Sequence, residues 1–151
     1  MNIKYKWKIF EELSKDELYA VLNLRQEVFI VEQNCPYIDL DYADQRAHHL
    51  LVYSEDELIG YLRAFSPGIK YDESSLGRII TVIKYRNRGI GKKITNEGVS
   101  FLLHKYPDNN IVISAQLIFI MLYQLLDIVD WGEVYLVDDI DHIELCLACT
   151  M

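Results

Sequence analysis

The chain has 151 residues, of which 51% are hydrophobic and 25% charged, and its formal net charge is −8. This length suits a single domain over residues 1–151, and the composition is globular rather than disordered. The acidic balance argues against nucleic acid as a partner, because binding there needs a basic face. The longest apolar run, 117–126, is too short to cross a membrane. With no signal peptide visible, we expect a cytoplasmic protein without a membrane partner.

The first half of the chain alternates strand and helix patterns. Residues 4–12 alternate as a strand, and Ser14 then caps a helix predicted to run to about Glu32. Residues 33–47 form a polar loop with three aspartates, whose spacing lacks the glycine and final Glu of a calcium site. We expect this loop to border a binding cleft. Residues 48–53 and 58–65 form a hairpin across a short polar turn.

The second half continues this alternation. Residues 76–83 carry apolar residues at successive positions, which predicts a central strand buried on both faces. A helix from 89 to 105, a strand at 110–114, a very apolar helix from 115 or 116 to 126, and two strands at 133–137 and 142–147 follow. The order predicts an α/β fold, a mixed sheet with helices on both faces.

Three cysteines, an odd number, indicate free thiols in an ordinary cytosolic composition. Cys146 and Cys149 have the spacing of half a zinc site, but no second pair follows. Residues three apart on a strand also face opposite sides. We therefore expect no metal.

A glycine-containing stretch between the central strand and the next helix indicates an anion site. Backbone N–H groups at a helix start point one way, and the helix dipole adds to them. Gly89 and Gly91 allow a ligand to approach the backbone, and four cations flank them: Arg86, Arg88, Lys92 and Lys93. A dinucleotide fingerprint would need a further glycine at position 94, which is Ile. A P-loop would need Ser or Thr at position 93, which is Lys.

The stretch Arg86-x-x-Gly89-x-Gly91 resembles the cofactor turn of the GNAT N-acetyltransferase superfamily. Residues 24–41 resemble its ElaA-like branch, as do Leu76-Gly77-Arg78-Ile79-Ile80, Ser114-Ala115-Gln116, Tyr123-Gln124, residues 133–135 and residues 139–143. The resemblance spans roughly residues 13–145 in one order. It implies a GNAT-like, mostly antiparallel central sheet with helices on both faces.

The resemblance also implies where acetyl-CoA, the cosubstrate, would bind. Its pyrophosphate would lie on the turn formed by Arg86, Asn87, Arg88, Gly89, Ile90, Gly91 and Lys92. Its pantetheine arm would pair with the backbone of Ile80, Thr81 and Val82, where one N–H would polarise the thioester carbonyl. A neutral amine would attack the thioester directly, and Tyr123 stands at the family's position for the proton donor to the departing thiolate.

The acceptor side is less defined by the sequence. Glu32 is the candidate base, while His49 and His142 are candidate substrate contacts. Asp39 and Asp41 could hold a cationic acceptor or be solvated, and Arg25 is interpreted as a structural ion pair. The acceptor would be a small-molecule amine or a protein amino group. Homodimers are common in the family and are possible here.

The sequence departs from the family pattern in one segment. Asp127-Ile128 replaces the usual Gly-Phe after the tyrosine, and residues 117–122 are apolar throughout where polar residues are usual. These changes put the position of Tyr123 and the acceptor site at issue. Two alternatives to an acetyltransferase therefore stay open: an acyl-CoA-binding protein with little catalysis, and a cofactor-free interaction module whose apolar helix packs on a partner.

Overall fold

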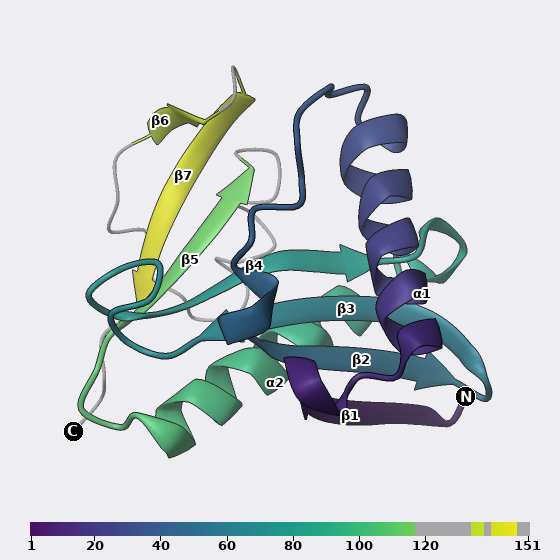
Figure 1. Cartoon of the computed structure of the whole chain (residues 1–151), viewed down its shortest axis with the longest axis horizontal. Helices are drawn as coiled ribbons and strands as arrows, with labels where there is room; N and C mark the ends of the chain where they lie inside the picture. Colours follow the sequence, from purple (N-terminus) through teal and green to yellow (C-terminus); the bar gives the residue numbers. More distant parts are fainter. Residues whose placement is uncertain (117–133, 138–139, 148–151) are drawn as a thin grey trace.

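The computed structural model describes residues 1–116, 134–137 and 140–147, with the backbone alone for 114–116 and the last two ranges. Seven strands and two long helices account for most of these residues (Figure 1). Their bounds are β1 Ile3–Ile9, α1 Lys15–Arg25, β2 His48–Ser54, β3 Glu57–Phe65, β4 Ser74–Thr81, α2 Ile90–Lys105, β5 Ile111–Gln116, β6 Val134–Val137 and β7 Ile140–Leu147.

The strands form one sheet in the order β1-β2-β3-β4-β5-β7-β6. Among the described strands, only β4 and β5 pair in parallel, and the other neighbours are antiparallel. The strand β4 is the fourth of seven, so the prediction of a central strand over this segment is confirmed. The mixed, mostly antiparallel sheet expected from the sequence is also confirmed.

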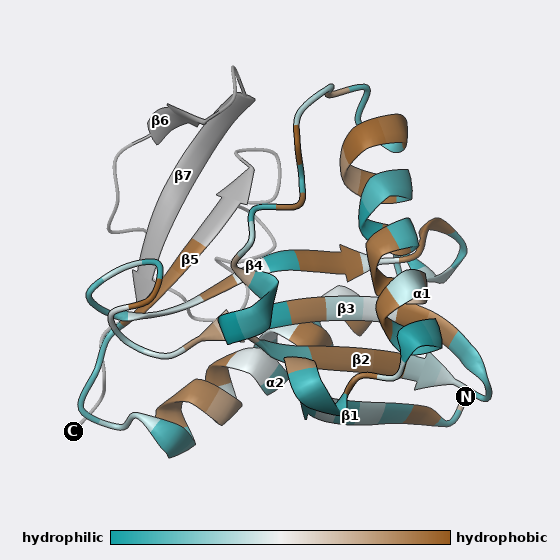
Figure 2. Ribbon diagram, viewed as in Figure 1, coloured by the Kyte–Doolittle hydropathy of each residue, from teal (hydrophilic) through white to brown (hydrophobic). Residues whose placement is uncertain are grey.

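The two helices cover opposite faces of the sheet. On one face Ile90, Ile94 and Leu102 of α2 pack on Leu50 and Leu62. On the other face, α1 packs on Leu51 and Tyr61, which alternate with Leu50 and Leu62 along β2 and β3, and on Ile80 of β4. Figure 2 shows the strands between the helices as predominantly apolar. Successive residues of these strands thus face opposite sides of the sheet, as a strand buried on both faces requires.

Several predicted boundaries were wrong; the strand predicted over 76–83, for example, runs over Ser74–Thr81. The first strand ends at Ile9 and a 3-10 turn, Phe10–Glu12, follows it. The predicted helix over 14–32 is an α-helix only to Arg25 and continues as a π-helix, η2, over Gln26–Glu32. Positions 115 and 116, predicted to start a helix, belong to β5 because they pair in register with Ile143 and His142 of β7.

The predicted helix cap at Ser14 is confirmed. The Ser14 hydroxyl accepts a hydrogen bond from the Glu17 N–H at 3.0 Å, which satisfies one of the unpaired donors at the start of α1. The helix predicted over 117–126 lies outside the described residues.

Candidate functional site

The sheet opens into a wedge between β4 and β5. Their pairing covers only Ser74–Leu76 and Ile111–Ile113. The remainder of β4 stays paired with β3 as far as Thr81, while β5 continues with β7 as far as Gln116. Figure 1 shows β4 and β5 diverging beyond their short contact. The backbone edge of β4 beyond Leu76 therefore has no sheet partner on this side among the described strands.

A bulge in β4 lies at the closed end of the wedge. Arg63 pairs with Gly77 and Tyr61 with Ile80, so three residue steps on β4 face two on β3. The additional residue falls next to Arg78, whose φ of 52° is in the left-handed region. A bulge bends and twists its strand, which is consistent with β4 turning away from β5 here.

The backbone groups at the end of β4 point alternately toward β3 and into the wedge. The Val82 N–H donates to the Ile59 carbonyl at 2.9 Å, on the β3 side. The Thr81 carbonyl accepts instead from Arg86 Nε at 2.8 Å. Neighbouring backbone groups of a strand alternate in direction, so the Thr81 peptide groups are those directed into the wedge. An extended ligand arm laid along β4 would find hydrogen-bonding backbone there.

The glycine turn connects this edge to the start of α2. Asn87 has φ 64° and Gly89 φ 76°, which reverse the chain and aim the helix start. The first helical hydrogen bond runs from the Lys93 N–H to the Gly89 carbonyl. The N–H groups of Ile90, Gly91 and Lys92 therefore have no acceptor within the helix.

Charge and exposure agree with an anion site at this turn. Asn87, Arg88, Gly89 and Lys92 are exposed at the N-terminus of a 16-residue helix, so a ligand can reach the unpaired donors. Arg88 and Lys92 add positive charge to the partial charge of the helix dipole. The predicted anion-binding turn therefore has the backbone geometry that it needs.

Arg86 is held by two elements at once. Besides the Thr81 carbonyl, its guanidinium binds both carboxylate oxygens of Glu32 in a fork, with Nη2 to Oε2 at 3.0 Å. Glu32 is the last residue of the π-helix, so the pair joins the end of that helix to the glycine turn. Both side chains are about one-third exposed. Arg86 thus shapes the turn through fixed contacts.

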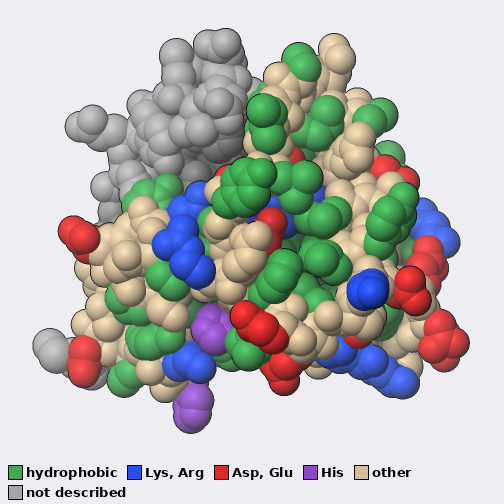
Figure 3. Space-filling view, in the orientation of Figure 1, with side chains coloured by type: hydrophobic (Ala, Val, Ile, Leu, Met, Phe, Trp, Pro, Cys, Tyr) green, Lys and Arg blue, Asp and Glu red, His purple; other side chains and the backbone are tan. Residues whose placement is uncertain are grey.

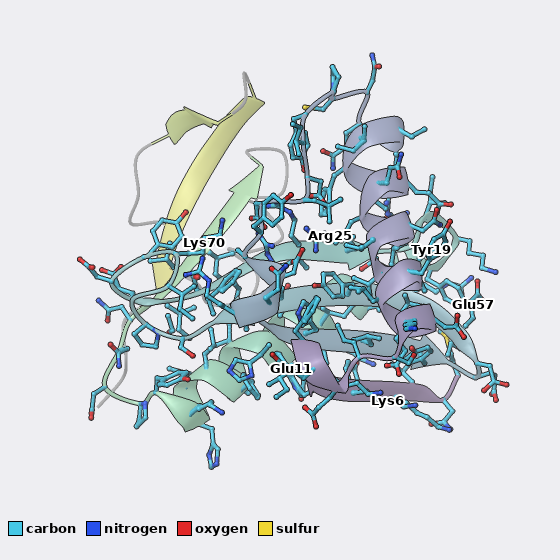
Figure 4. All side chains as sticks on the ribbon, viewed as in Figure 1. Lys6, Glu11, Tyr19, Arg25, Glu57 and Lys70 are labelled. Carbon is cyan, nitrogen blue, oxygen red and sulfur yellow. The ribbon has the colours of Figure 1, made fainter. Side chains whose placement is uncertain are left out.

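A cluster of arginines and aspartates is buried beside the wedge. Arg25 is fully buried; its Nε bonds Asp39 and its Nη1 bonds Asp44, each at 2.7 Å. Figure 4 shows Arg25, the last residue of α1, to the left of the helix and near β4. The interpretation of Arg25 as a structural ion pair is confirmed, because a buried guanidinium is stable only when its donors are paired.

The cluster extends through Arg63 of β3. Arg63 bonds Asp44 at 2.8 Å and Asp41 at 2.5 Å, and Lys70 from the loop after β3 also bonds Asp41 at 2.9 Å. Burial alone would raise the pKa of Asp41, but the hydrogen bonds from Arg63 and Lys70 outweigh it and lower the pKa. Asp39, Asp41 and Asp44 are therefore partners of arginines in ion pairs and not free loop groups.

Comparison with known proteins shows which family the chain belongs to. The acetyltransferase (GNAT) family matches residues 16–114. The chain is 35% identical to protein ElaA of Escherichia coli strain K12 over 134 residues, 87% of this chain and 88% of that protein. The chain belongs to the GNAT family. Membership supports acyl-CoA-dependent acyl transfer, and the identity with ElaA confirms the ElaA-like branch.

Other relatives of this GNAT chain agree. It is 35% identical to a UPF0039 protein of Synechocystis over 146 residues, 96% of this chain and 95% of that one. The solved structure of an acyl-CoA N-acyltransferase from Pseudomonas aeruginosa has a TM-score of 0.89 at 33% identity, covering 97% of this chain and 100% of that chain. Among the described residues of this GNAT chain, no helix has the length and apolarity to cross a membrane.

The two candidate histidines lie in different settings. His49 is 1% exposed, with Nδ1 2.6 Å from the Tyr61 hydroxyl and Nε2 2.9 Å from the Asp44 carbonyl. Burial lowers the pKa of His49, which favours the neutral ring. A substrate could reach this ring only by displacing one of those partners, so the surroundings of His49 favour a structural role. His142 lies on β7, paired with Gln116 and Tyr135.

Tyr123 lies outside the described residues, so its role as proton donor stays a prediction. The sequence interpretation missed four residues in or beside the arginine–aspartate cluster: Arg63, Arg78 and Tyr61, and the exposed Lys70. One signal was available for Arg63. It stands in an otherwise apolar strand near a loop with three aspartates, and buried charges need partners.

Proposed function

We propose that this chain is an acetyl-CoA-dependent N-acetyltransferase that acts on a primary amine. The wedge between β4 and β5, which leads to the glycine turn at the start of α2, is the observation that carries the proposal. Among the described residues, it offers a strand edge without a partner strand for an extended arm and a row of N–H groups without helical acceptors for phosphate, in one continuous path. A pantetheine arm that ends in a pyrophosphate has this combination of needs.

The proposed binding follows the path from the turn inward. Backbone donors from Arg88 to Lys92 take the pyrophosphate, and Arg86 keeps the turn in place through the Thr81 carbonyl. The arm lies along Ile80, Thr81 and Val82, where a backbone N–H polarises the thioester carbonyl. The P. aeruginosa relative is named an acyl-CoA N-acyltransferase, which supports the same substrate class here.

The proposed chemistry is direct transfer. The amine nitrogen attacks the thioester carbon, the new C–N bond forms, and the C–S bond breaks. The amine gives up a proton to a base, and the departing thiolate takes one from Tyr123. Glu32 is the candidate base, and its fork to Arg86 would orient it. That pairing also engages both carboxylate oxygens, so a water chain is the alternative proton acceptor.

Replacing Glu32 distinguishes a catalytic base from a residue that positions the turn. If Glu32 is the base, Glu32→Gln lowers kcat by about 10² to 10⁴ while the acetyl-CoA affinity changes little. If Glu32 acts only by holding Arg86, the same variant weakens acetyl-CoA binding and leaves kcat near the original value. Steady-state thiol release and calorimetry on one preparation separate the two.

Thiol release with a panel of primary amines tests the proposed reaction as a whole. The proposal expects release that requires both acetyl-CoA and an amine, with the acetylated amine detected by mass spectrometry. Tight acetyl-CoA binding without turnover of any amine would support an acyl-CoA-binding protein instead. Absence of binding at millimolar acetyl-CoA would refute both.

A further inference from the structure

Arg78 occupies an unusual place in the buried cluster. Its Nε bonds Asp39 Oδ1 at 2.6 Å and its Nη2 bonds the Asp39 carbonyl at 3.1 Å, both along one edge of the guanidinium. The end-on edge, formed by Nη1 and Nη2, is the geometry that binds a carboxylate through two hydrogen bonds. On this edge Nη2 lies 3.7 Å from Asp41 Oδ2, in ion-pair range but beyond hydrogen-bond distance. The Arg78 side chain is 25% exposed, whereas Arg25 and Arg63 are at most 2% exposed.

The formal charges of the cluster leave one positive charge in excess. Four cations, Arg25, Arg63, Arg78 and Lys70, face three carboxylates, and each carboxylate already serves at least two cations. Burial lowers the pKa of His49 and raises the pKa of Tyr61, so both are uncharged near pH 7. The cluster therefore carries one net positive charge in a chain of net charge −8.

The backbone at Arg78 is strained in a way that glycine would relieve. Its φ of 52° is unfavourable for a residue with a side chain, and the neighbouring Gly77 does not carry the positive φ. Strain of this kind persists where the surrounding structure fixes it, and it concentrates at functional sites. The bulge aims the Arg78 side chain at Asp39, on the α1 side of the sheet.

Arg78 is also close to the proposed acyl group along the strand. It precedes Ile80 by two residues, which is about 7 Å at the usual rise per strand residue. The loop segment that holds Asp39 presents Ile38, Leu40 and Tyr42 outward, each more than half exposed. Figure 3 shows hydrophobic side chains with Lys and Arg atoms between them over the middle of this face.

We propose that Arg78 binds a carboxylate of the acceptor, so that the acceptor is an amino acid or a similar small molecule carrying an amine and a carboxylate. This inference rests on the proposed function and names its substrate class. The carboxylate forks onto the end-on edge of Arg78, and the amine of the same molecule reaches the thioester beside Ile80. The net positive charge of the cluster compensates the carboxylate that enters.

Matched acceptors test the inference. Thiol release from acetyl-CoA is measured with α-amino acids, β-alanine and γ-aminobutyrate, each beside its amide, which keeps the amine and removes the carboxylate charge. The wild-type chain is expected to use at least one acid with a kcat/KM at least tenfold above that of its amide. In Arg78→Gln the KM for that acid rises at least tenfold, and turnover of the amide stays within twofold. Comparing each compound between variants cancels differences in amine basicity.

Two further variants control for folding and for general charge. Lys8 of β1 is a cation of similar exposure, paired with Glu17 at 2.7 Å. The variant Lys8→Gln removes this charge and is expected to keep the preference for acids. Arg78→Lys keeps the charge without the fork and is expected to recover part of the lost affinity. Thermal unfolding shows whether each variant is folded.

The outcomes separate this inference from the proposed function. Equal use of acids and amides by the wild-type chain, or a preference that survives in Arg78→Gln, overturns the role of Arg78 while the acetyltransferase proposal stands. Turnover confined to amines that lack a carboxylate overturns it as well. If acetyl-CoA binds and no compound of the panel is turned over, the substrate class is wrong. If acetyl-CoA does not bind, the proposed function itself fails.

Discussion

Gly89→Ala is expected to weaken acetyl-CoA binding sharply while folding is nearly kept. Gly89 has φ 76°, and a Cβ built there meets no heavy atom of the described residues within 4 Å. The methyl group would therefore meet no clash among the described residues and would add bulk at the turn, where the proposal puts the pyrophosphate. A left-handed residue with a side chain costs about 1–2 kcal/mol. Relief of this strain would turn the N–H groups of Ile90 and Gly91 away from the ligand.

The loss can be estimated from the hydrogen bonds at risk. A hydrogen bond to a charged group contributes about 1.5–3 kcal/mol, and each 1.4 kcal/mol is a factor of ten in affinity. Loss of one such bond to the pyrophosphate would therefore raise the Kd for acetyl-CoA about ten- to hundredfold. Isothermal calorimetry on the whole chain measures this change directly.

Gly68→Ala is the matched control. Gly68 has φ 87°, again with no heavy atom within 4 Å of a Cβ among the described residues, but it lies in the loop between β3 and β4. Both variants should lose similar unfolding free energy, and only Gly89→Ala should lose affinity. An unchanged Kd in Gly89→Ala, or an equal rise in both variants, would refute the reasoning about the turn.

Three further predictions concern stability. Gly60→Ala should lower the free energy of unfolding by about 1–3 kcal/mol, since its Cβ would lie 3.0 Å from the Ile80 carbonyl oxygen. Gly77→Ala should not lower it, because a Cβ there meets no heavy atom of the described residues within 4 Å. Arg25→Ala should cost about 3–5 kcal/mol in urea unfolding, because it leaves buried carboxylates short of a partner. Burial acts to raise the pKa of Asp44 and the charge of Arg25 outweighs it, so the folded pKa is below the unfolded value. This stabilisation is complete above about pH 4 and is lost on further acidification, and the loss should be smaller in Arg25→Ala. Equal acid sensitivity of the two proteins would contradict that assignment.

The sequence predicted the order of the described elements and the position of the glycine turn well, because both rest on local signals. Alternation, a capping serine and glycines at a strand–helix junction act over a few residues. The glycine turn was placed correctly for this reason: Gly89 is the residue that precedes α2.

Features that depend on contacts between residues distant in the sequence could not be predicted from the sequence. Nothing in residues 26–32 distinguishes a π-helix from an α-helix, because the apolar spacing suits both. The bulge at Arg78 depends on the register between β3 and β4, which the sequence of either strand does not specify. Asp39 and Asp41 read as solvated loop residues until the fold brings arginines from α1, β3 and β4 to them.

Backbone amide shifts of the ¹⁵N-labelled chain during an acetyl-CoA titration test the central claim most directly. We expect saturable shifts at Arg88 to Lys92, where unpaired N–H groups meet the pyrophosphate, and at Ile80 to Val82 along the open edge of β4. Residues of β1, on the far edge of the sheet, should not shift. Saturable binding whose shifts avoid both segments, or no shift at millimolar acetyl-CoA, would contradict the proposed site.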